Sequence, residues 1–132
     1  MKTIILLCVM SLSLFSSNEV ILYHLEWQDN VETKTKKMNW YEAVYYCKEL
    51  SLHKRTNWRL PKLRELQSLV DIYRYSPSIK KAFKFTTSKS YYWSSTVLAS
   101  NKDKAWHVFY KYGDSYYSAK TTKQSVRCVR NR

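Results

Sequence analysis

The chain has 132 residues, of which 23 are lysine or arginine and 10 are aspartate or glutamate, giving a formal net charge of +13. This length fits one domain, and the sequence contains no internal repeat, no collagen-like repeat and no low-complexity linker. The charge attracts polyanions such as nucleic acid, acidic glycan or anionic lipid, but it does not choose among them. Composition therefore excludes a repeat architecture and leaves the class of partner open.

Residues 1–17 have the pattern of a signal peptide. Lys2 is followed by an apolar stretch from Ile4 to Phe15, which is too short to span a bilayer comfortably, and then by small residues. An uncleaved anchor and a buried first strand are the alternatives. Cleavage would leave residues 18–132 as a single domain with a net charge of +12 and no transmembrane segment. We expect an exported protein, whether periplasmic, secreted or on the cell surface, and export argues against nucleic acid as its partner.

The first part of the mature chain predicts a strand, a loop and a helix. Residues 20–27 mix β-branched and aromatic side chains and predict a strand, whereas the polar residues 29–37 predict a loop. Asn39 and Glu42 form a capping-box pattern that opens a helix. Its predicted buried face, at helical spacing, consists of Trp40, Ala43, Val44, Cys47 and Leu50.

A second helix is predicted to begin near Pro61, after a polar turn at residues 53–57, and to run to about Tyr73. Proline suits a helix entrance because its missing N–H would be unpaired there anyway. The predicted apolar stripe consists of Leu63, Leu66, Leu69, Val70 and Tyr73. Pro77 marks another entrance, before a short amphipathic segment at residues 78–83.

The last third of the chain predicts short strands separated by turns. These strands are expected at residues 91–96, 105–110, 115–119 and 125–130. Gly113 is the single glycine of the chain, and it falls between two of them, where a hairpin needs positive φ. Because the chain contains one glycine, we expect the backbone at Gly113 to require it.

Two cysteines, Cys47 and Cys128, remain after cleavage. An even number in an exported chain indicates one disulfide, which would join the first predicted helix to the last predicted strand. A metal pair and a catalytic thiol are the alternatives. The separation of 81 positions, with no local CxxC or CxxH, argues against zinc.

Six blocks of the mature chain follow one another in the order seen in a known family. They are "LEWQDN" (25–30), "NWYEAVYYCKEL" (39–50), "NWRLPKLRELQSLVD" (57–71), "YYWSST" (91–96), "AWHVFYKYG" (105–113) and "VRCVR" (126–130). Over residues 22–130 the chain thus resembles the Lcl C-terminal domain family, bacterial extracytoplasmic modules with a C-type-lectin-like fold. The resemblance implies an α+β fold in which two helices flank a small, mostly antiparallel sheet, with the chain ends close together. It also implies that ligands meet the loops of residues 74–104 and the strand surface after them.

Conspicuous residues of these blocks are interpreted as structural. They are Trp58, Arg59, Pro61, Glu65, Trp93 and Gly113. Trp58 is expected in the core, and the planar guanidinium of Arg59 is expected to pair internally with Glu65 or Asp71. The alternative is a role in binding or chemistry, because function resides in sites and not in folds.

The chain departs from the family pattern at Asn57, where aspartate is usual, and at Lys62, where threonine or asparagine is usual. A lysine cannot accept hydrogen bonds from the first N–H groups of a helix, so this entrance is expected to be weaker by about 1 kcal/mol. Glu65, at the third helical position, still favours the positive end of the helix.

Catalytic and metal-binding patterns are missing from the sequence. His24, His53 and His107 are scattered and form no HxxxH or HExxH pair, and the serines of "WSST" lack a GxSxG elbow. The fold resembles that of formylglycine-generating oxidases, but both cysteines are assigned to the framework here, so that activity is not transferred. The EPN, QPD and WND tripeptides of calcium-dependent lectins do not occur. We expect no enzyme activity, no metal and no cofactor, with a cryptic hydrolase or transferase as the remote alternative.

Lysines and tyrosines interleave in the late loops and are the candidate ligand-binding residues. The predicted ligand-binding residues are Lys80, Lys81, Lys84, Lys89, Lys102, Lys104, Tyr91, Tyr112 and Tyr116, and "KTKK" adds Lys34, Lys36 and Lys37 as a further basic group. Cations suit sulfate or carboxylate, and tyrosine faces pack on sugar rings. The hypothesis is a non-enzymatic module that binds an acidic or sulfated glycan or another polyanion, in line with the glycosaminoglycan-binding adhesin that names the family. A solvated basic surface, on a structural domain that contacts an envelope or host surface protein, is the alternative.

Overall fold

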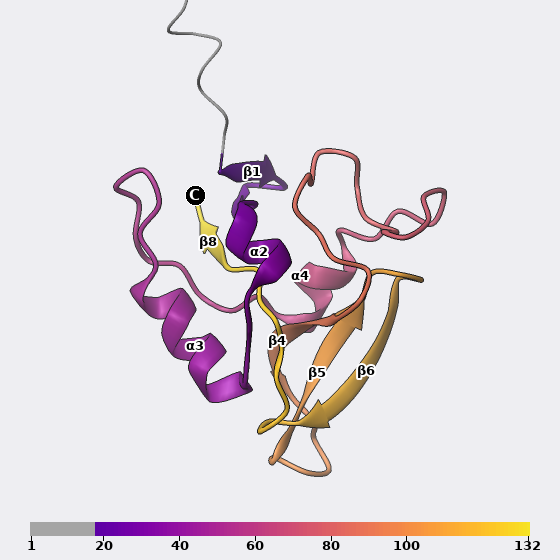
Figure 1. Cartoon of the computed structure of the whole chain (residues 1–132). Helices are drawn as coiled ribbons and strands as arrows, with labels where there is room; N and C mark the ends of the chain where they lie inside the picture. The colour runs from indigo at the N-terminus through magenta and orange to yellow at the C-terminus, as the bar shows by residue number, and fades with distance from the viewer. Residues whose placement is uncertain (1–17) are drawn as a thin grey trace, which may run out of the picture.

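A computed structural model describes residues 18–132 (Figure 1). The predicted signal peptide, residues 1–17, lies outside the described residues. The described part is a small α+β domain with the following elements: β1 Glu19–Leu22, β2 Leu25–Gln28, α2 Val31–Thr35, β3 Lys37–Met38, α3 Trp40–Glu49, α4 Leu63–Gln67, β4 Tyr91–Val97, β5 Lys104–Phe109, β6 Asp114–Ala119, β7 Gln124–Ser125 and β8 Val129–Asn131. No helix of this part combines the length and the apolar character needed to cross a membrane.

The described strands form two sheets rather than the single small sheet that the resemblance implies. One has the order β1-β2-β8 and is antiparallel. The other has the order β3-β7-β4-β5-β6 and is antiparallel except for the parallel pairing of β4 with β7. Since β1 and β8 lie in the same sheet, both ends of the described chain meet there (Figure 1).

The region before α3 differs from the prediction in two ways. The predicted strand at 20–27 is a hairpin, because Tyr23 and His24 adopt positive φ values of 55° and 64° and reverse the chain. Positive φ is uncommon for residues other than glycine, and neither glycine nor asparagine stands at this turn, so the sequence gives no clear turn signal. The predicted loop at 29–37 contains α2 and β3; α2 opens with a capping box in which Asn30 and Thr33 bond each other's backbone N–H.

The predicted helix after Asn39 is confirmed as α3. The Asn39 side chain accepts from the Glu42 N–H at 2.9 Å, and the Glu42 carboxylate accepts from the Asn39 N–H at 2.9 Å. Ala43 and Cys47 are fully buried, as predicted. Val44, which was assigned to the same face, is exposed.

The second predicted helix is wrong in length, and the short amphipathic helix is absent. α4 ends at Gln67, and Val70 instead pairs with Ile79 in an isolated β-bridge. Leu66 and Leu69 are buried as predicted, but Tyr73 is 92% exposed. Residues 78–83 are irregular because their backbone groups find distant partners, for example the Lys80 N–H on the Leu69 carbonyl at 2.9 Å. Tertiary contacts thus override the helical spacing on both sides of Pro77.

The late strands are found near the predicted positions, with one division. The predicted strand at 125–130 is split between β7 in one sheet and β8 in the other, and residues 126–128 between them are buried. Gly113 has a φ of +82°, and a Cβ placed on it would lie 2.7 Å from Val70 Cγ1. The turn between β5 and β6 therefore needs glycine for its φ and for the space.

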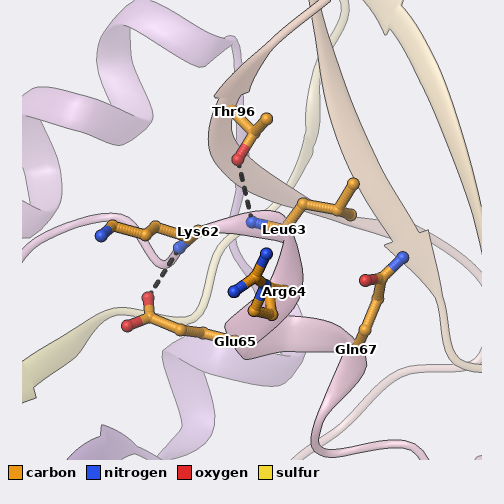
Figure 2. A pocket seen from close by; sticks show the side chains of 6 residues that line it. All are labelled: Lys62, Leu63, Arg64, Glu65, Gln67 and Thr96. Atoms are coloured by element: carbon orange, nitrogen blue, oxygen red, sulfur yellow. Dashed lines mark hydrogen bonds between the residues drawn. The ribbon is translucent and has the colours of Figure 1, made fainter.

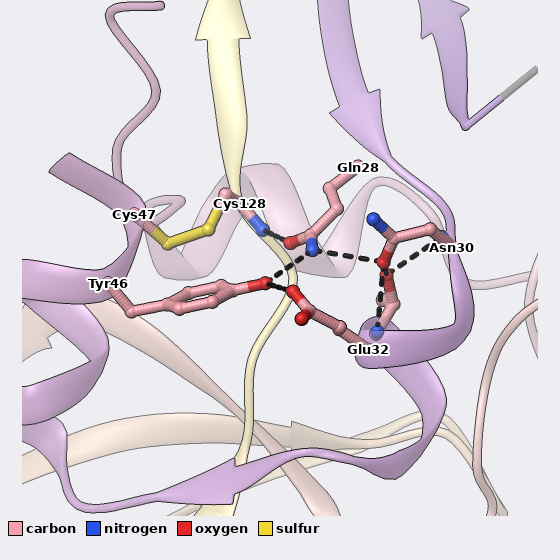
Figure 3. The surroundings of a disulfide bond; sticks show 7 residues. Gln28, Asn30, Glu32, Tyr46, Cys47 and Cys128 are labelled. Carbon is pink, nitrogen blue, oxygen red and sulfur yellow. Dashed lines mark hydrogen bonds between the residues drawn. A yellow bond between two sulfur atoms is a disulfide. The ribbon is translucent and has the colours of Figure 1, made fainter. Parts of the chain in front are cut away.

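Cys47 and Cys128 form the predicted disulfide, and both are fully buried (Figure 3). The bond ties α3 to the segment directly before β8. By the chain-entropy model a loop of this length contributes about 4–5 kcal/mol to stability. Gln28 lies beside the disulfide and connects its two sides. Its side-chain carbonyl accepts from the Cys128 N–H at 3.0 Å, and its side-chain amide donates to the Tyr46 hydroxyl at 2.9 Å.

Two clusters of buried apolar side chains form the core. The disulfide-side core consists of Met38, Ala43, Cys47, Trp58, Leu60, Trp93, Ala105, Val126 and Cys128. The other core consists of Trp27, Leu66, Leu69, Ile79, Phe83, Tyr92, Val108, Tyr110 and Val129. The strands β4 and β5 contribute to both clusters, so they lie between the two.

Candidate functional site

A pocket with a volume of about 390 Å³ lies between α2 and the loop that follows α4. It is lined by Lys34, Arg74, Pro77, Lys81, Phe83, Lys84 and Thr86. The four cations among them are exposed, and none forms an ion pair with a carboxylate of residues 18–132. We call this site the basic pocket. Because no lining residue carries a negative charge, an anion that enters meets donors and no repelling group.

A buried ion pair holds the backbone beneath the basic pocket. Asp29 is 3% exposed, and its carboxylate accepts from the backbone N–H groups of Lys84 at 2.9 Å and Phe85 at 3.0 Å. The same carboxylate accepts from Arg127 Nη1 at 3.0 Å. Three donors on one buried carboxylate fix the position of the loop segment that carries Lys84.

Arg127 binds this segment from below. Its Nη2 donates to the Phe85 carbonyl at 2.8 Å and to Thr86 Oγ1 at 2.6 Å, and its guanidinium carbon lies 4.8 Å from the centroid of the Phe83 ring. Arg127 is fully buried. Neither Asp29 nor Arg127 is among the residues predicted from the sequence, because nothing in either segment identifies a partner 98 positions away.

Aromatic rings form a second feature, which runs from one face of β4, β5 and β6 to the β5–β6 turn and the loop after α4. The ring centroids lie 6.1 Å apart for Tyr75 and Tyr112, 6.0 Å for Tyr112 and Phe109, 4.6 Å for Phe109 and Tyr91, and 6.4 Å for Tyr91 and Tyr116. We call these five rings the aromatic strip. Three of its tyrosines are more than half exposed. The strip brings together the predicted tyrosines, and Tyr75 directly follows Arg74 of the basic pocket in the chain.

The predicted lysines do not gather in one place. Lys81 and Lys84 line the basic pocket, whereas Lys80 lies 6.0 Å from the centroid of the Tyr23 ring on β1–β2. Lys102 and Lys104 lie at the β4–β5 turn, at the opposite end of the sheet from the loop of residues 71–90 (Figure 1). Lys89 is exposed in the loop before β4.

Two cations of the basic pocket, Lys34 and Arg74, are not among the predicted ligand-binding residues. Lys34 belongs to the further basic group at 34–37, and Arg74 was not singled out. The clustering of basic residues along the sequence is the one signal for this pocket. It detects Lys34 but does not indicate that Lys34 lies close to residues 74–84 in the folded chain. The contact depends on how the loop folds back over α2.

The corner at residues 58–65 surrounds the entrance to α4 (Figure 2). Arg59 donates to both Glu65 oxygens at 2.8 and 2.9 Å, and Glu65 also accepts from the Lys62 N–H at 2.8 Å. Burial acts to raise the pKa of the Glu65 carboxyl, but these hydrogen bonds hold the pKa below its ordinary value. Trp58 is buried, and its indole N–H donates to the Arg55 carbonyl at 2.9 Å.

Thr96 of β4 supplies the cap that Lys62 cannot provide. The Lys62 side chain makes no capping bond, but Thr96 Oγ1 accepts from the Leu63 N–H at 3.0 Å (Figure 2). A hollow of about 620 Å³ lies around these groups. Its carboxylate and hydroxyl already hold the helix entrance, so we assign this hollow no ligand.

His107 offers the one contact that resembles a catalytic pair within the described residues. Its Nε2 lies 2.7 Å from Ser118 Oγ, but its Nδ1 is buried without a hydrogen-bond partner among those residues. Burial of the imidazole lowers the pKa of His107 to about 4, which makes it a weak base at neutral pH. A catalytic triad needs a third group to orient the histidine. The described residues also contain no group of three His, Cys, Asp or Glu side chains that could hold a metal ion.

Comparison with known proteins gives one family. A family model described as the Lcl C-terminal domain matches residues 21–130. No curated protein matches the chain.

Proposed function

Since the chain belongs to the Lcl C-terminal domain family, an extracytoplasmic type of domain, we propose that it is a non-enzymatic module that binds acidic or sulfated glycans. The C-type-lectin-like fold implied by the family is part of this proposal. The buried disulfide fits an exported protein, because such bonds persist in oxidising compartments.

The basic pocket is the observation that carries the proposal. Four cations surround a volume of about 390 Å³ without a competing carboxylate. Lysine and arginine form charge-assisted hydrogen bonds to sulfate and carboxylate groups, which are roughly twice as strong as neutral ones. Because Asp29 and Arg127 fix the backbone at Lys84 and Phe85, this wall of the pocket is held in place before a ligand arrives.

The aromatic strip is the proposed contact for the uncharged part of the glycan. Pyranose rings present C–H faces that pack on aromatic rings, and the strip offers five rings in a continuous series of contacts. Exposed tyrosines also offer hydroxyl groups to sugar hydroxyls. The charged groups of the glycan thus bind in the basic pocket, and its sugar rings pack on the aromatic strip.

A protein partner is the second candidate, and β6 is the observation that favours it. This six-residue strand is at the edge of its sheet, and its Tyr116 and Tyr117 are about half exposed. An edge strand has unpaired backbone groups that can bind a strand of a partner. Salt-insensitive binding of one envelope or host surface protein would favour this function.

Heparin binding measured by calorimetry at low and high salt tests the proposal. We expect Lys81→Ala/Lys84→Ala to weaken binding about tenfold and to reduce its salt dependence, since two charge-assisted contacts are lost. Lys102→Ala/Lys104→Ala removes the same net charge at the other end of the sheet and is the matched control, with an expected change below about twofold. Tyr112→Ala should weaken binding without changing the salt dependence.

Equal losses in the two lysine pairs would contradict the proposal, because they would indicate attraction by the overall charge alone. Equal binding of heparin and an uncharged dextran would contradict it as well. Either result would leave the protein-partner function as the better candidate.

A further inference from the structure

A third pocket lies between α3 and the segment that leads into α4. Its volume is about 410 Å³, within the range of roughly 300–1,000 Å³ that is typical of small-molecule sites. It is lined by Trp40, Val44, Lys48, Trp58, Arg59, Leu60, Lys62 and Ser95. None of these residues lines the basic pocket or belongs to the aromatic strip. We call it the tryptophan pocket.

The aromatic walls of this pocket are held in fixed positions. The Trp40 indole N–H donates to the Ser94 carbonyl at 2.9 Å, and the Trp58 indole N–H donates to the Arg55 carbonyl at 2.9 Å. The Lys120 ammonium lies 4.2 Å from the centroid of the Trp40 ring. Both indole donors are thus used inside the protein, and a ligand would meet the apolar surface of the rings.

Two lysines add positive charge to the lining of the pocket. The Arg59 guanidinium is already bound to Glu65 and to the Asn131 side chain. Lys48 and Lys62 are exposed, and neither forms an ion pair with a carboxylate of residues 18–132. No lining residue is acidic. Each ammonium carries three donors for an incoming anion.

The lining disfavours a sugar as the occupant. Ser95 is the one neutral polar side chain among the lining residues, so most hydroxyl groups of a bound saccharide would face apolar surface. A polar group that loses water without gaining a partner weakens binding. An apolar body with a single anionic group satisfies both the walls and the two lysines.

We propose that the tryptophan pocket binds a small organic monocarboxylate with an aryl or alkyl body. The body packs against Trp40, Val44 and Leu60, and the carboxylate is bound by Lys48 and Lys62. This site is separate from the proposed glycan site, and its binding does not depend on the glycan function.

A charge series on one body tests the proposal by calorimetry, with 3-phenylpropionate, 3-phenylpropan-1-ol and 3-phenylpropylamine as probes. We expect the acid to bind at least tenfold more tightly than the alcohol, and the amine not to bind. In ¹H–¹⁵N spectra the acid should shift the indole N–H signals of Trp40 and Trp58 and leave that of Trp27, which lies in the other core, unchanged.

Lys48→Gln/Lys62→Gln should reduce the affinity for the acid about tenfold, while the alcohol binds as before. Lys102→Gln/Lys104→Gln is the control of equal charge and should bind the acid like the parent protein. The proposal is overturned if the acid fails to bind, if acid and alcohol bind equally, or if both lysine pairs lose affinity equally. Heparin titrations of the same variants separate this result from the fate of the glycan proposal, because Lys48 and Lys62 lie outside the basic pocket.

Discussion

Arg127 and Cys128 are neighbours in the chain, yet they attach the C-terminal segment to different regions by different chemistry. Cys128 bonds covalently to Cys47 of α3 inside the disulfide-side core. Arg127 reaches Asp29 and the backbone of residues 85–86 through buried hydrogen bonds. The first region is a buried apolar core, and the second is a charged network beneath the basic pocket.

The two attachments are expected to have different effects, the disulfide on stability and the Arg127 network on the candidate site. A disulfide stabilises chiefly by restricting the unfolded chain, so it acts on the whole domain. A buried ion pair costs desolvation on both sides, and its best-attested value is to specify one arrangement. We therefore expect the disulfide to determine whether the domain is folded, and the Arg127 network to determine the shape of the basic pocket.

The largest expected effect is the loss of the disulfide. Cys47→Ala/Cys128→Ala should lower the free energy of unfolding by about 4–5 kcal/mol, measured by urea denaturation. Where the variant is still folded, heparin affinity should stay within about twofold of the parent, because neither cysteine contacts the basic pocket. A large loss of affinity in the folded variant would contradict the separation of the two regions.

The next effect is that of Arg127→Met, which leaves the Asp29 carboxylate buried without its cation. We expect a loss of about 3–5 kcal/mol in urea denaturation, together with weaker heparin binding as the 83–86 segment loosens. Asp29→Asn/Arg127→Met removes both charges and should recover part of the stability. If the single variant kept full heparin affinity, the network would have no role in shaping the pocket.

The smallest expected effect is a pH dependence of stability that arises from His107 in β5. The pKa of His107 is about 4 in the folded protein, against about 6.5 in the unfolded chain. Well above pH 6.5 His107 is neutral in both states, and its contribution to the free energy of unfolding is complete. As the pH falls below 6.5, the unfolded chain binds a proton at His107 before the folded protein does. The free energy of unfolding then falls by ~1.4 kcal/mol per pH unit, to a total loss of about 3 kcal/mol near pH 4. His107→Gln keeps a hydrogen-bonding side chain beside Ser118 but does not titrate, so denaturation between pH 7 and pH 4 should show a flatter profile. Parallel profiles for both proteins would contradict the assignment to His107.

Much of the framework could be predicted from local signals. The capping box at Asn39 gives α3 its start, the parity of cysteines gives the disulfide, and the lone glycine gives the β5–β6 turn. Each signal depends on residues near one another or on simple counting. Prediction failed where distant contacts decide, as at Val70, whose bridge to Ile79 ends the helical region early.

The candidate site was predictable only in part for the same reason. The interleaving of lysines and tyrosines in the late loops identified Lys81 and Lys84 together with Tyr91, Tyr112 and Tyr116. The site also depends on Asp29 and Arg127, which are 98 positions apart, and on Arg74, whose neighbours in the sequence give no hint of the pocket. Such partners are visible only when the chain is folded.

The adjacency of Arg127 and Cys128 also bears on how the protein matures. If the C-terminal segment docked one position out of step, a slip in one direction would place the guanidinium opposite Cys47, and a slip in the other would place the sulfur opposite the Asp29 carboxylate. Neither mismatch can form a bond, so oxidation can lock only the correctly docked segment. The disulfide and the charged network therefore require the same register of the C-terminal segment.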